Sequence, residues 1–348
     1  DSLCIQPGTS PGIQPLGDAG PDMNLAHPPV DCISRVRFAP FEGSHQLLAS
    51  SWDTTVRLYD TDSTNPPGLQ KCKLAVLDCS FTSDVGRCVS GGLEQKIVLH
   101  DFRAEKEICL GKHDEAVKCV EFHEQTQQVF SASWDRTLRA WDARKPPTAN
   151  AVHRLGAKAF SMDVCQDKVV VAGSDRRIHI FDVRNLECPL EKRDSILKNQ
   201  IRCVKVGLSQ RSFACGSVEG RVALDYFEPE EQKFAYGFKC HRVREADEEE
   251  QVHPVNAIAF HPIYGTFATG GSDGGVCLWD GHAKKRLLKL KAFHTSVSSL
   301  SFSADGSQLA VGVSYTFDEG ERMPPPVPQI VVRNFTDLEV MPKAHSDF

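Results

Sequence analysis

The sequence predicts an all-β fold, a seven-bladed β-propeller, and two recurring patterns support that prediction. The first is an acidic tight turn that returns at intervals of 41, 41, 40, 44 and 54 residues. The turn acids are Asp53, Glu94, Asp135, Asp175, Glu219 and Asp273. A repeat of ~40–45 residues that closes on Trp-Asp, as at Trp141-Asp142 and Trp279-Asp280, is typical of a four-stranded WD-repeat blade. Because a single blade cannot bury both of its faces, the repeats are expected to stack around one axis.

The second pattern is a six-residue segment that opens each unit and reads apolar-x-small-apolar-x-apolar. Its alternation with period two marks a β-strand. The segments are 33–38, 76–81, 117–122, 159–164, 201–206, 255–260 and 297–302. Seven such openings predict seven blades. Arg35 and Asp78 depart from the rule because they are charged residues at the small position, and the sequence leaves open whether they pair or reach the central channel.

The other strands of each unit follow in a fixed order. Second strands are expected at 46–50, 87–90, 128–131 and 266–269, among others. The acidic turn comes next, then a third strand that ends in an aromatic residue and Asp, and in most units an outer edge strand. The seventh unit has strands at 308–314 and 329–335 joined by a long insert at 318–328, and it lacks a fourth strand. Residues 22–26 are expected to supply that strand, because closure of the ring removes two exposed edges.

These elements define the domain organisation. Residues 1–20 are rich in Pro and Gly and are predicted to form a disordered tail. Residues 21–343 are predicted to form one propeller, and residues 344–348 a C-terminal tail. The acidic segment 245–250 is expected to be a solvated loop, which explains the interval of 54 residues.

Composition excludes several classes of function. The net charge of −6 argues against generic binding to a phosphate backbone. The sequence contains no run of eighteen apolar residues that could span a membrane. The 13 cysteines include no CxxC pairs at zinc spacing, which indicates reduced thiols in a nuclear or cytosolic protein. No cofactor and no metal site are predicted. The basic run 284–291 is interpreted as an edge strand that resists sheet-to-sheet aggregation rather than as a nucleic-acid contact.

The turn acids are predicted to have a structural role. In this repeat type the acid can bond a histidine from the preceding loop and a hydroxyl on the second strand, and His113, Ser131 and Asp135 fit that pattern. Asp53, Asp175 and Asp273 are expected in equivalent places. A buried and fully satisfied network of this kind makes a blade rigid. The same three residue types form the catalytic triad of many hydrolases. No nucleophile elbow accompanies them in this sequence, so no catalytic residue is predicted.

The alternating direction of the strands places the turn between second and third strands, and the connection into each blade, on one face, which we call the top face. The residue before the turn acid is Trp52, Leu93 and Trp134 in the first three blades. These side chains predict an exposed apolar patch with the composition of a binding hot spot. The alternative is that each tryptophan only covers its own turn.

Four cations are predicted to converge on one sector of the same face: Arg202, Arg221, Lys239 and Arg242. The planar fork of arginine takes an oxyanion in two parallel hydrogen bonds, and lysine adds a point charge suited to phosphate. Together with the apolar patch, the cations indicate an extended peptide ligand that carries carboxylate or phosphate groups. The alternative is a solvated charged rim.

Several segments then resemble a known family. They are Ser50-Ser-Trp-Asp-Thr-Thr-Val-Arg-Leu-Tyr-Asp60, Ser90-Gly-Gly-Leu93, Ser133-Trp-Asp135, Val218-Glu-Gly-Arg-Val-Ala223, Tyr236-Gly-Phe-Lys-Cys-His-Arg242 and Pro254-Val-Asn-Ala-Ile258. They closely resemble WD-repeat mitotic checkpoint proteins of the Bub group. RNA-export propellers share the segments at 219–223 and 238–242, whereas those at 50–60 and 90–93 favour the checkpoint branch.

The resemblance implies a non-enzymatic spindle-assembly checkpoint adaptor in the nucleus and at the kinetochore, with a cytoplasmic pool. Such proteins bind the GLEBS motif of Bub-type checkpoint kinases across the top face, and they dock phosphorylated MELT-type repeats of a kinetochore scaffold. The expected form is a monomeric propeller without direct contacts to nucleic acid or membrane. A GLEBS-binding mRNA-export adaptor at the nuclear pore is the alternative.

The resemblance also assigns residues. It implies Trp52 and Trp134 as apolar contacts, Arg202 and Arg221 against paired glutamates, and Arg221 and Lys239 as readers of phosphate. Leu93 joins the predicted peptide contacts and Arg242 the predicted phosphate contacts, because each shares its sector of the face.

Overall fold

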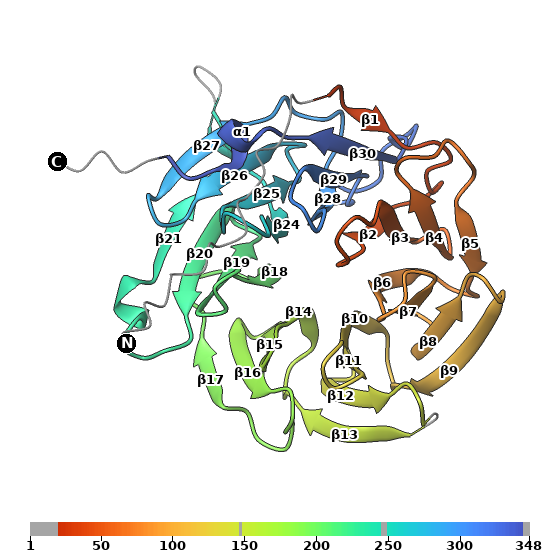
Figure 1. The fold of residues 1–348 in the computed structure, drawn as a ribbon. Coiled ribbons are helices and arrows are strands. Elements are labelled where there is room, and N and C mark those ends of the chain that lie inside the picture. The colour runs from red at the N-terminus through yellow and green to blue at the C-terminus, as the bar shows by residue number, and fades with distance from the viewer. Residues whose placement is uncertain (1–19, 146–147, 245–248, 344–348) are drawn as a thin grey trace, which may run out of the picture.

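The computed structural model describes residues 20–145, 148–244 and 249–343, and within them it shows seven four-stranded antiparallel sheets arranged in a ring (Figure 1). The predicted seven-bladed propeller is thereby confirmed. Apart from Gly20, the predicted tail 1–20 lies outside the described residues. The predicted tail 344–348 and residues 245–248 of the acidic loop lie outside them as well.

Each blade is formed by four strands that follow one another from the channel outward. Blade one holds β2 (Ile33–Phe38), β3 (Gln46–Ser51), β4 (Thr55–Asp60) and β5 (Gly68–Lys71). Blade two holds β6 (Val76–Phe81), β7 (Arg87–Gly92), β8 (Lys96–Asp101) and β9 (Lys106–Lys112). Blade three holds β10 (Val117–His123), β11 (Gln128–Ser133), β12 (Thr137–Asp142) and β13 (Ala149–Arg154). Blade four holds β14 (Ala159–Val164), β15 (Lys168–Gly173), β16 (Arg177–Asp182) and β17 (Glu191–Asp194).

The remaining blades follow the same plan. Blade five holds β18 (Ile201–Val206), β19 (Ser212–Ser217), β20 (Arg221–Tyr226) and β21 (Tyr236–Lys239), with the 3-10 helix η1 (Gln232–Phe234) before its edge strand. A small hairpin, β22 (Arg242–Val243) and β23 (Gln251–Val252), precedes blade six. Blade six holds β24 (Val255–Phe260), β25 (Phe267–Gly271), β26 (Val276–Asp280) and β27 (Lys285–Lys289).

Blade seven is completed from the other end of the chain. It holds β28 (Val297–Phe302), β29 (Gln308–Val313) and β30 (Gln329–Asn334), followed by the short helix α1 (Asp337–Val340). Its outer strand is β1 (Met23–Asn24), in which Met23 lies opposite Val332 and Asn24 opposite Val331. The N-terminal strand therefore closes the ring in the place where the sequence predicts it (Figure 1).

The core lies between neighbouring blades, because strand alternation sends every second side chain toward each adjacent sheet. Between blades three and four, Phe130, Phe181 and Leu138 are essentially inaccessible to water. Similar clusters fill the spaces between the other blades. Because the blades are packed on both faces, the loops that they carry on the top face have fixed relative positions.

The inner strands are joined across the channel wall by a repeated hydrogen bond. In several blades the third residue of the inner strand accepts the backbone N–H of the neighbouring inner strand. These bonds link Val36 N to Ser299 Oγ at 3.0 Å, Val120 N to Asp78 Oδ2 at 2.9 Å and Val204 N to Ser161 Oγ at 3.0 Å. The aspartate at this position in blade two therefore performs the task of the serine in blades four and seven.

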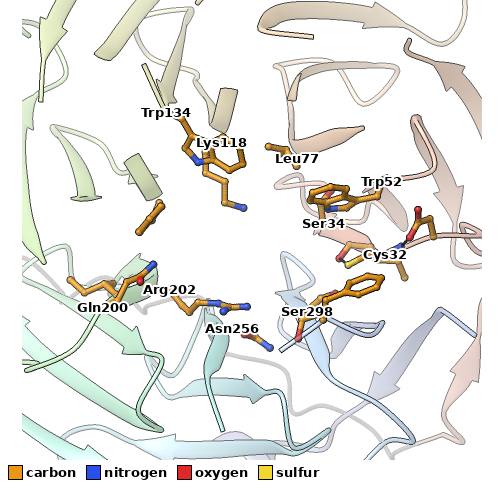
Figure 2. Close-up of a pocket in the computed structure, with 16 residues that line it drawn as sticks. Cys32, Ser34, Trp52, Leu77, Lys118, Trp134, Gln200, Arg202, Asn256 and Ser298 are labelled. Atoms are coloured by element: carbon orange, nitrogen blue, oxygen red, sulfur yellow. Dashed lines mark hydrogen bonds between the residues drawn. The ribbon is translucent and has the colours of Figure 1, made fainter. Parts of the chain in front are cut away.

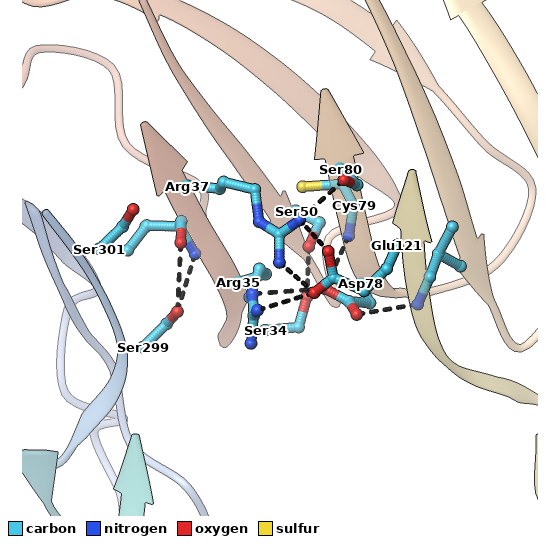
Figure 3. Close-up of polar contacts among 12 residues, drawn as sticks. Ser34, Arg35, Arg37, Ser50, Asp78, Cys79, Ser80, Glu121, Ser299 and Ser301 are labelled. Atoms are coloured by element: carbon cyan, nitrogen blue, oxygen red, sulfur yellow. Dashed lines mark hydrogen bonds and ion pairs between the residues drawn. The ribbon is translucent and has the colours of Figure 1, made fainter. Parts of the chain in front are cut away.

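This bond also explains the two charged residues that break the sequence pattern. Arg35 Nε lies 3.5 Å from Asp78 Oδ1, so the two residues pair, and both line the channel (Figure 3). Arg35 reaches Glu121 as well, with Nη2 at 3.4 Å from Oε1. The channel wall thus holds charges that are neutralised by partners from different blades.

No helix within the described ranges is long and apolar enough to cross a bilayer. In the same ranges, no three or more His, Cys, Asp and Glu side chains are placed to hold a metal ion. The twelve cysteines of the described residues are free thiols.

Candidate functional site: the mouth of the channel and the rim of blade five

The channel opens on the top face into a cavity of about 660 Å³, which we call the channel mouth (Figure 2). Because all seven inner strands share one register, the second residue of each strand lines this cavity. These residues are Ser34, Leu77, Lys118, Phe160, Arg202, Asn256 and Ser298. The mouth is therefore built from seven equivalent positions, and the side chains found there determine its chemistry.

Two indole rings stand at its edge. Trp52 and Trp134 precede the turn acids of blades one and three, and both line the mouth. Backbone bonds hold their turns against the entering strands, with Trp52 N 2.9 Å from Cys32 O and Trp134 N 3.0 Å from Ala116 O. The Trp52 side chain is 44% exposed, which leaves much of its ring available to a ligand. The indole nitrogen of Trp134 is buried and has no hydrogen-bond partner among the described residues.

Leu93, the third predicted apolar contact, occupies the equivalent turn of blade two. It is half-buried and does not line the mouth. Its backbone N–H bonds Ala75 O at 2.9 Å, and the buried side chain of Leu77 fills this sector of the cavity instead. The structure therefore brings the two tryptophans together at one opening and leaves Leu93 outside it.

Two cations project into the mouth from different blades (Figure 2). Arg202 Nη1 lies 3.2 Å from Asp318 Oδ1, a carboxylate of the insert between β29 and β30. Lys118 forms no ion pair with a residue of the described chain. Sequence reasoning missed both Lys118 and Asp318. Lys118 could have been found, because it occupies the same strand position as Arg202, whereas Asp318 lies in an insert outside the repeat.

A second group of cations lies on the outer part of blade five. Arg221 and Lys239 are directly opposite each other in the β20–β21 pair. Each has a distant acidic partner, since Arg221 Nε is 3.8 Å from Glu219 and Lys239 Nζ is 3.7 Å from Glu250. More than a third of each cationic side chain is exposed, so these pairs are weak and can exchange for a ligand. We call Arg221 and Lys239 the rim pair.

Arg242 lies beside the rim pair but is engaged differently. Its Nη1 is 2.7 Å from Glu250, and its Nη2 and Nε donate to the backbone carbonyls of Glu219 and Gly220. These bonds fasten the turn of blade five to the hairpin before blade six. The guanidinium of Arg242 therefore stabilises the backbone next to the rim pair. Little of its hydrogen-bonding capacity is left for a ligand.

The mouth and the rim pair share the top face. Val218 N, in the turn of blade five, bonds Gln200 O at 3.0 Å, only two residues before Arg202. None of Arg221, Lys239 and Arg242 lines the mouth, however. The single cationic sector predicted from the sequence is thus divided into an inner cation at the channel and an outer pair at the blade edge.

Two blades contain the same buried network below their turns. In blade three, His113 Nδ1 is 2.9 Å from Asp135 Oδ2 and His113 Nε2 is 2.7 Å from Ser131 Oγ, which also accepts Trp141 Nε1. Burial lowers the pKa of His113, so the ring is neutral at physiological pH. Both ring nitrogens and the serine hydroxyl are engaged, and Ser131 is inaccessible to water. The geometry is that of a structural element.

Blade six repeats the arrangement with different residues. His241 Nδ1 is 2.8 Å from Asp273 Oδ1, and its Nε2 is 2.9 Å from Thr269 Oγ1, which also accepts the indole N–H of Trp279. Asp273 was predicted from its turn position, and its histidine partner was not. His241 could have been recognised, because it lies in the connection before blade six as His113 lies before blade three.

The other two predicted acids have different surroundings. Asp53 accepts hydrogen bonds from Thr55 and from Val30 N, and pairs with Arg57 at 2.9 Å, without a histidine. Asp175 corrects the expectation, because its side chain is exposed and, among the described residues, accepts a hydrogen bond only from Arg177 N, at 3.3 Å. The loop before blade four carries no histidine, so no ring reaches this carboxylate.

Comparison with known proteins places the chain in a wider context. The model of the WD domain, G-beta repeat, matches residues 23–60, 105–142 and 248–280. The chain is 45% identical to the mitotic checkpoint protein BUB3.1 of Arabidopsis thaliana over 92% of its length and 94% of that protein. It is 41% identical to the mitotic checkpoint protein bub3 of Dictyostelium discoideum, over 91% of this chain and 96% of that one.

More distant relatives carry a different name. The chain is 33% identical to the mRNA export factor GLE2 of Chaetomium thermophilum, over 90% of this chain and 89% of that protein. Among solved structures, the crystal structure of the RRP9 WD40 repeats superimposes with a TM-score of 0.76 and covers 90% of this chain and 97% of that one. With 17% sequence identity, that similarity concerns the fold alone.

Proposed function

The chain belongs to the Bub3 family of mitotic checkpoint proteins, and from this premise we propose that it is a non-enzymatic adaptor of the spindle-assembly checkpoint. Its top face binds the GLEBS motif of Bub-type checkpoint kinases. The same face binds phosphorylated MELT-type repeats of a kinetochore scaffold, so that the kinases are recruited to kinetochores. The protein acts in the nucleus and at the kinetochore and has a cytoplasmic pool.

The observation that carries the proposal is the composition of the channel mouth. Two indoles, Trp52 and Trp134, share one cavity with two cations, Lys118 and Arg202. Tryptophan and arginine are enriched where partner proteins bind most strongly, and a concave site excludes water around their contacts. Such a cavity suits a peptide that inserts an apolar side chain between the rings and presents carboxylates to the cations. A polyanion without apolar groups would leave the indoles unused.

The rim pair supports the second part of the proposal. Arg221 and Lys239 combine a planar guanidinium with an ammonium on one exposed strand pair. A phosphate group has three strong acceptor oxygens and about two negative charges at neutral pH, and so it can displace the distant partners Glu219 and Glu250. Because the rim pair lies outside the mouth, a phosphorylated segment and a GLEBS segment can occupy the face together.

A titration tests the proposal. A GLEBS-motif peptide and a phosphorylated MELT-type peptide are titrated separately, by calorimetry, into the wild-type chain and into Arg221→Glu. We expect both peptides to bind the wild-type protein and the phosphopeptide to lose at least tenfold in affinity for the variant, because an acid replaces a cation opposite Lys239. Glu187→Gln, a change of an exposed acid in blade four, is the control for altered charge. Equal affinities in wild type and Arg221→Glu would reject the role of the rim pair.

The export relatives support one alternative, a GLEBS-binding adaptor of mRNA export at the nuclear pore. Their identity to this chain, 33% and 32%, is lower than that of the checkpoint proteins, at 45% and 41%. Affinity purification from mitotic cells distinguishes the two. Recovery of nucleoporins without a checkpoint kinase would favour export, whereas recovery of a Bub-type kinase would favour the checkpoint.

A further inference from the structure

The insert between β29 and β30 folds back over the channel mouth. We call residues 315–323 the strap. Phe317 and Thr316 line the mouth together with the tryptophans. Phe317 has a backbone φ of 59°, a left-handed conformation that is unfavourable for a residue with a Cβ, and its ring is 56% exposed. The conformation positions the next residue, Asp318, so that its carboxylate faces inward.

Both carboxylate oxygens of Asp318 have polar partners. Its Oδ1 pairs with Arg202 Nη1 at 3.2 Å, and its Oδ2 accepts hydrogen bonds from Ser272 Oγ and Thr316 Oγ1, each at 2.5 Å. Burial alone would raise the pKa of Asp318, but the two hydroxyl donors and the positive charge of Arg202 lower it, so the group is ionised at neutral pH. Ser272 occupies in blade six the turn position that Trp52 and Trp134 occupy in blades one and three.

We propose that Asp318 fills, from within the chain, the carboxylate subsite that Arg202 offers to an acidic ligand, so that the strap and the ligand compete for the channel mouth. This inference rests on the proposed function, because it assumes an acidic peptide in the mouth. It adds a specificity-determining residue that the repeat does not contain. A ligand whose own carboxylate replaces Asp318 on Arg202 competes with the strap, and peptides without such a carboxylate therefore bind more weakly.

The contacts of the strap show why such an exchange can occur. Among the described residues, Asp318 is the only member of 317–323 whose side chain forms a hydrogen bond or ion pair outside the strap. Thr316, near the start of the strap, also bonds Ser296 Oγ at 3.2 Å, whereas the side-chain bonds of the other strap residues are internal, as in Tyr315 Oη with Gly320 O at 2.7 Å and Arg322 with Glu319. Segments with few outward bonds open at low free energy, and the strained φ of Phe317 favours opening further.

The size of the effect follows from the population of the open strap. When only a fraction of the molecules is competent to bind, the apparent dissociation constant equals the intrinsic one divided by that fraction. A strap that is closed in nine of ten molecules therefore weakens binding about tenfold. Removal of the Asp318 charge should recover this lost affinity. If Asp318 competes with the ligand, loss of its carboxylate tightens binding. If Asp318 only supports the shape of the site, the same loss weakens binding.

The experiment compares Asp318→Asn with Glu319→Gln, a matched loss of one carboxylate whose partner is Arg322 rather than Arg202. A synthetic GLEBS-motif peptide is titrated into the wild type and both variants. We expect Asp318→Asn to bind the peptide roughly three- to tenfold more tightly than the wild type and Glu319→Gln to bind it with unchanged affinity. In an Arg202→Gln background, Asp318→Asn should no longer have an effect. Unchanged or weaker binding by Asp318→Asn would overturn the competition.

A second measurement needs no ligand. Hydrogen exchange of the amides in 317–323 should be faster in Asp318→Asn than in wild type, and close to wild type in Glu319→Gln. Exchange that Asp318→Asn leaves unchanged would show that Asp318 does not hold the strap. If none of the proteins binds the peptide, the proposed function fails together with the competition, whereas equal binding by all three overturns the competition alone.

Discussion

Arg37 of β2 and Glu121 of β10 form an ion pair inside the channel, although their strands belong to blades one and three and blade two stands between them. The pair is bidentate, and Arg37 Nη1 also donates to Ser80 Oγ of blade two at 2.7 Å (Figure 3). Burial of Glu121 would raise its pKa, but the adjacent guanidinium outweighs that effect and lowers it. Three blades are thus connected through one buried charge pair.

Glu121→Gln should therefore destabilise the whole ring. The substitution leaves the guanidinium of Arg37 in the channel without its counter-charge, and breaking one partner of a buried pair costs about 3 kcal/mol. Urea unfolding measures the change. Glu124→Gln, at a nearby exposed acid, should change stability by no more than about 0.5 kcal/mol. The double substitution Arg37→Met with Glu121→Leu should recover most of the loss, and an undiminished loss would contradict this explanation.

Trp52→Ala should weaken binding of a GLEBS-motif peptide by about 2 kcal/mol and leave the stability of the fold nearly unchanged, because the ring is half exposed at the mouth. Trp141→Phe is the matched opposite. Its indole is buried and donates to Ser131 Oγ at 2.7 Å, so its loss should lower the unfolding temperature without changing peptide affinity. Calorimetry and thermal unfolding distinguish the two. A stability loss for Trp52→Ala as large as that for Trp141→Phe would mean that Trp52 only covers its turn.

The separation of the mouth from the rim pair predicts two independent defects. Lys239→Gln should reduce affinity for a phosphorylated MELT-type peptide about tenfold and leave its unphosphorylated form unaffected, because an ammonium that meets phosphate is lost. Arg202→Gln should reduce affinity for a GLEBS-motif peptide only. Titration of both peptides into both variants provides the four comparisons. If each variant weakened both peptides equally, the two groups of cations would form one site.

Stability should decline as pH falls from 6.5 toward 4, with His261 among the causes. Burial lowers the pKa of His261 to about 4 from an ordinary value of 6.5. Its Nδ1 accepts the backbone N–H groups of Ile263 and Tyr264, each at 3.2 Å, so a proton there would face two donors. Because the folded-state pKa is the lower one, the contribution is present above pH 6.5 and is lost as pH falls through this range.

The comparison of His261→Gln with wild type tests this point. Gln can accept the same two N–H groups without titrating, so the variant should lack on the order of 1–2 kcal/mol of the acid-induced loss between pH 6.5 and pH 4. Urea unfolding at several pH values measures the slope. A slope identical in the two proteins would exclude His261 as a contributor.

Removal of β1 should open the ring. A chain that begins at residue 26 lacks Met23, Asn24 and the buried Leu25, so the outer edge of β30 becomes exposed. Unpaired edges invite association between sheets. We expect a lower unfolding temperature and the appearance of larger species in light scattering. A chain that begins at residue 20 keeps the strand and should behave like the full sequence, and equal behaviour of both shortened chains would show that β1 contributes little.

The repeat pattern made the fold predictable from the sequence. The seven inner strands lie where the recurring pattern of apolar and small residues predicts them, because equivalent positions of every blade pack against equivalent neighbours. The position of Trp52 and Trp134 at one opening was equally accessible, since a shared register carries equivalent residues to one face. The same reasoning would have found Lys118 if it had been extended to every inner strand.

Only the tertiary structure decided the contacts between residues that do not occupy equivalent positions in the repeat. Asp318 lies in an insert, and no periodicity indicates that it meets Arg202, which is 116 residues away. The pairing of Arg37 with Glu121 depends on the diameter of the channel, and the capture of Arg242 by two backbone carbonyls depends on the path of a hairpin. The sequence alone determined which element each residue belongs to and which face it lies on, because local periodicity is read along the chain. Which charges become partners is decided by distances across the closed ring, and these exist only after all seven blades have packed.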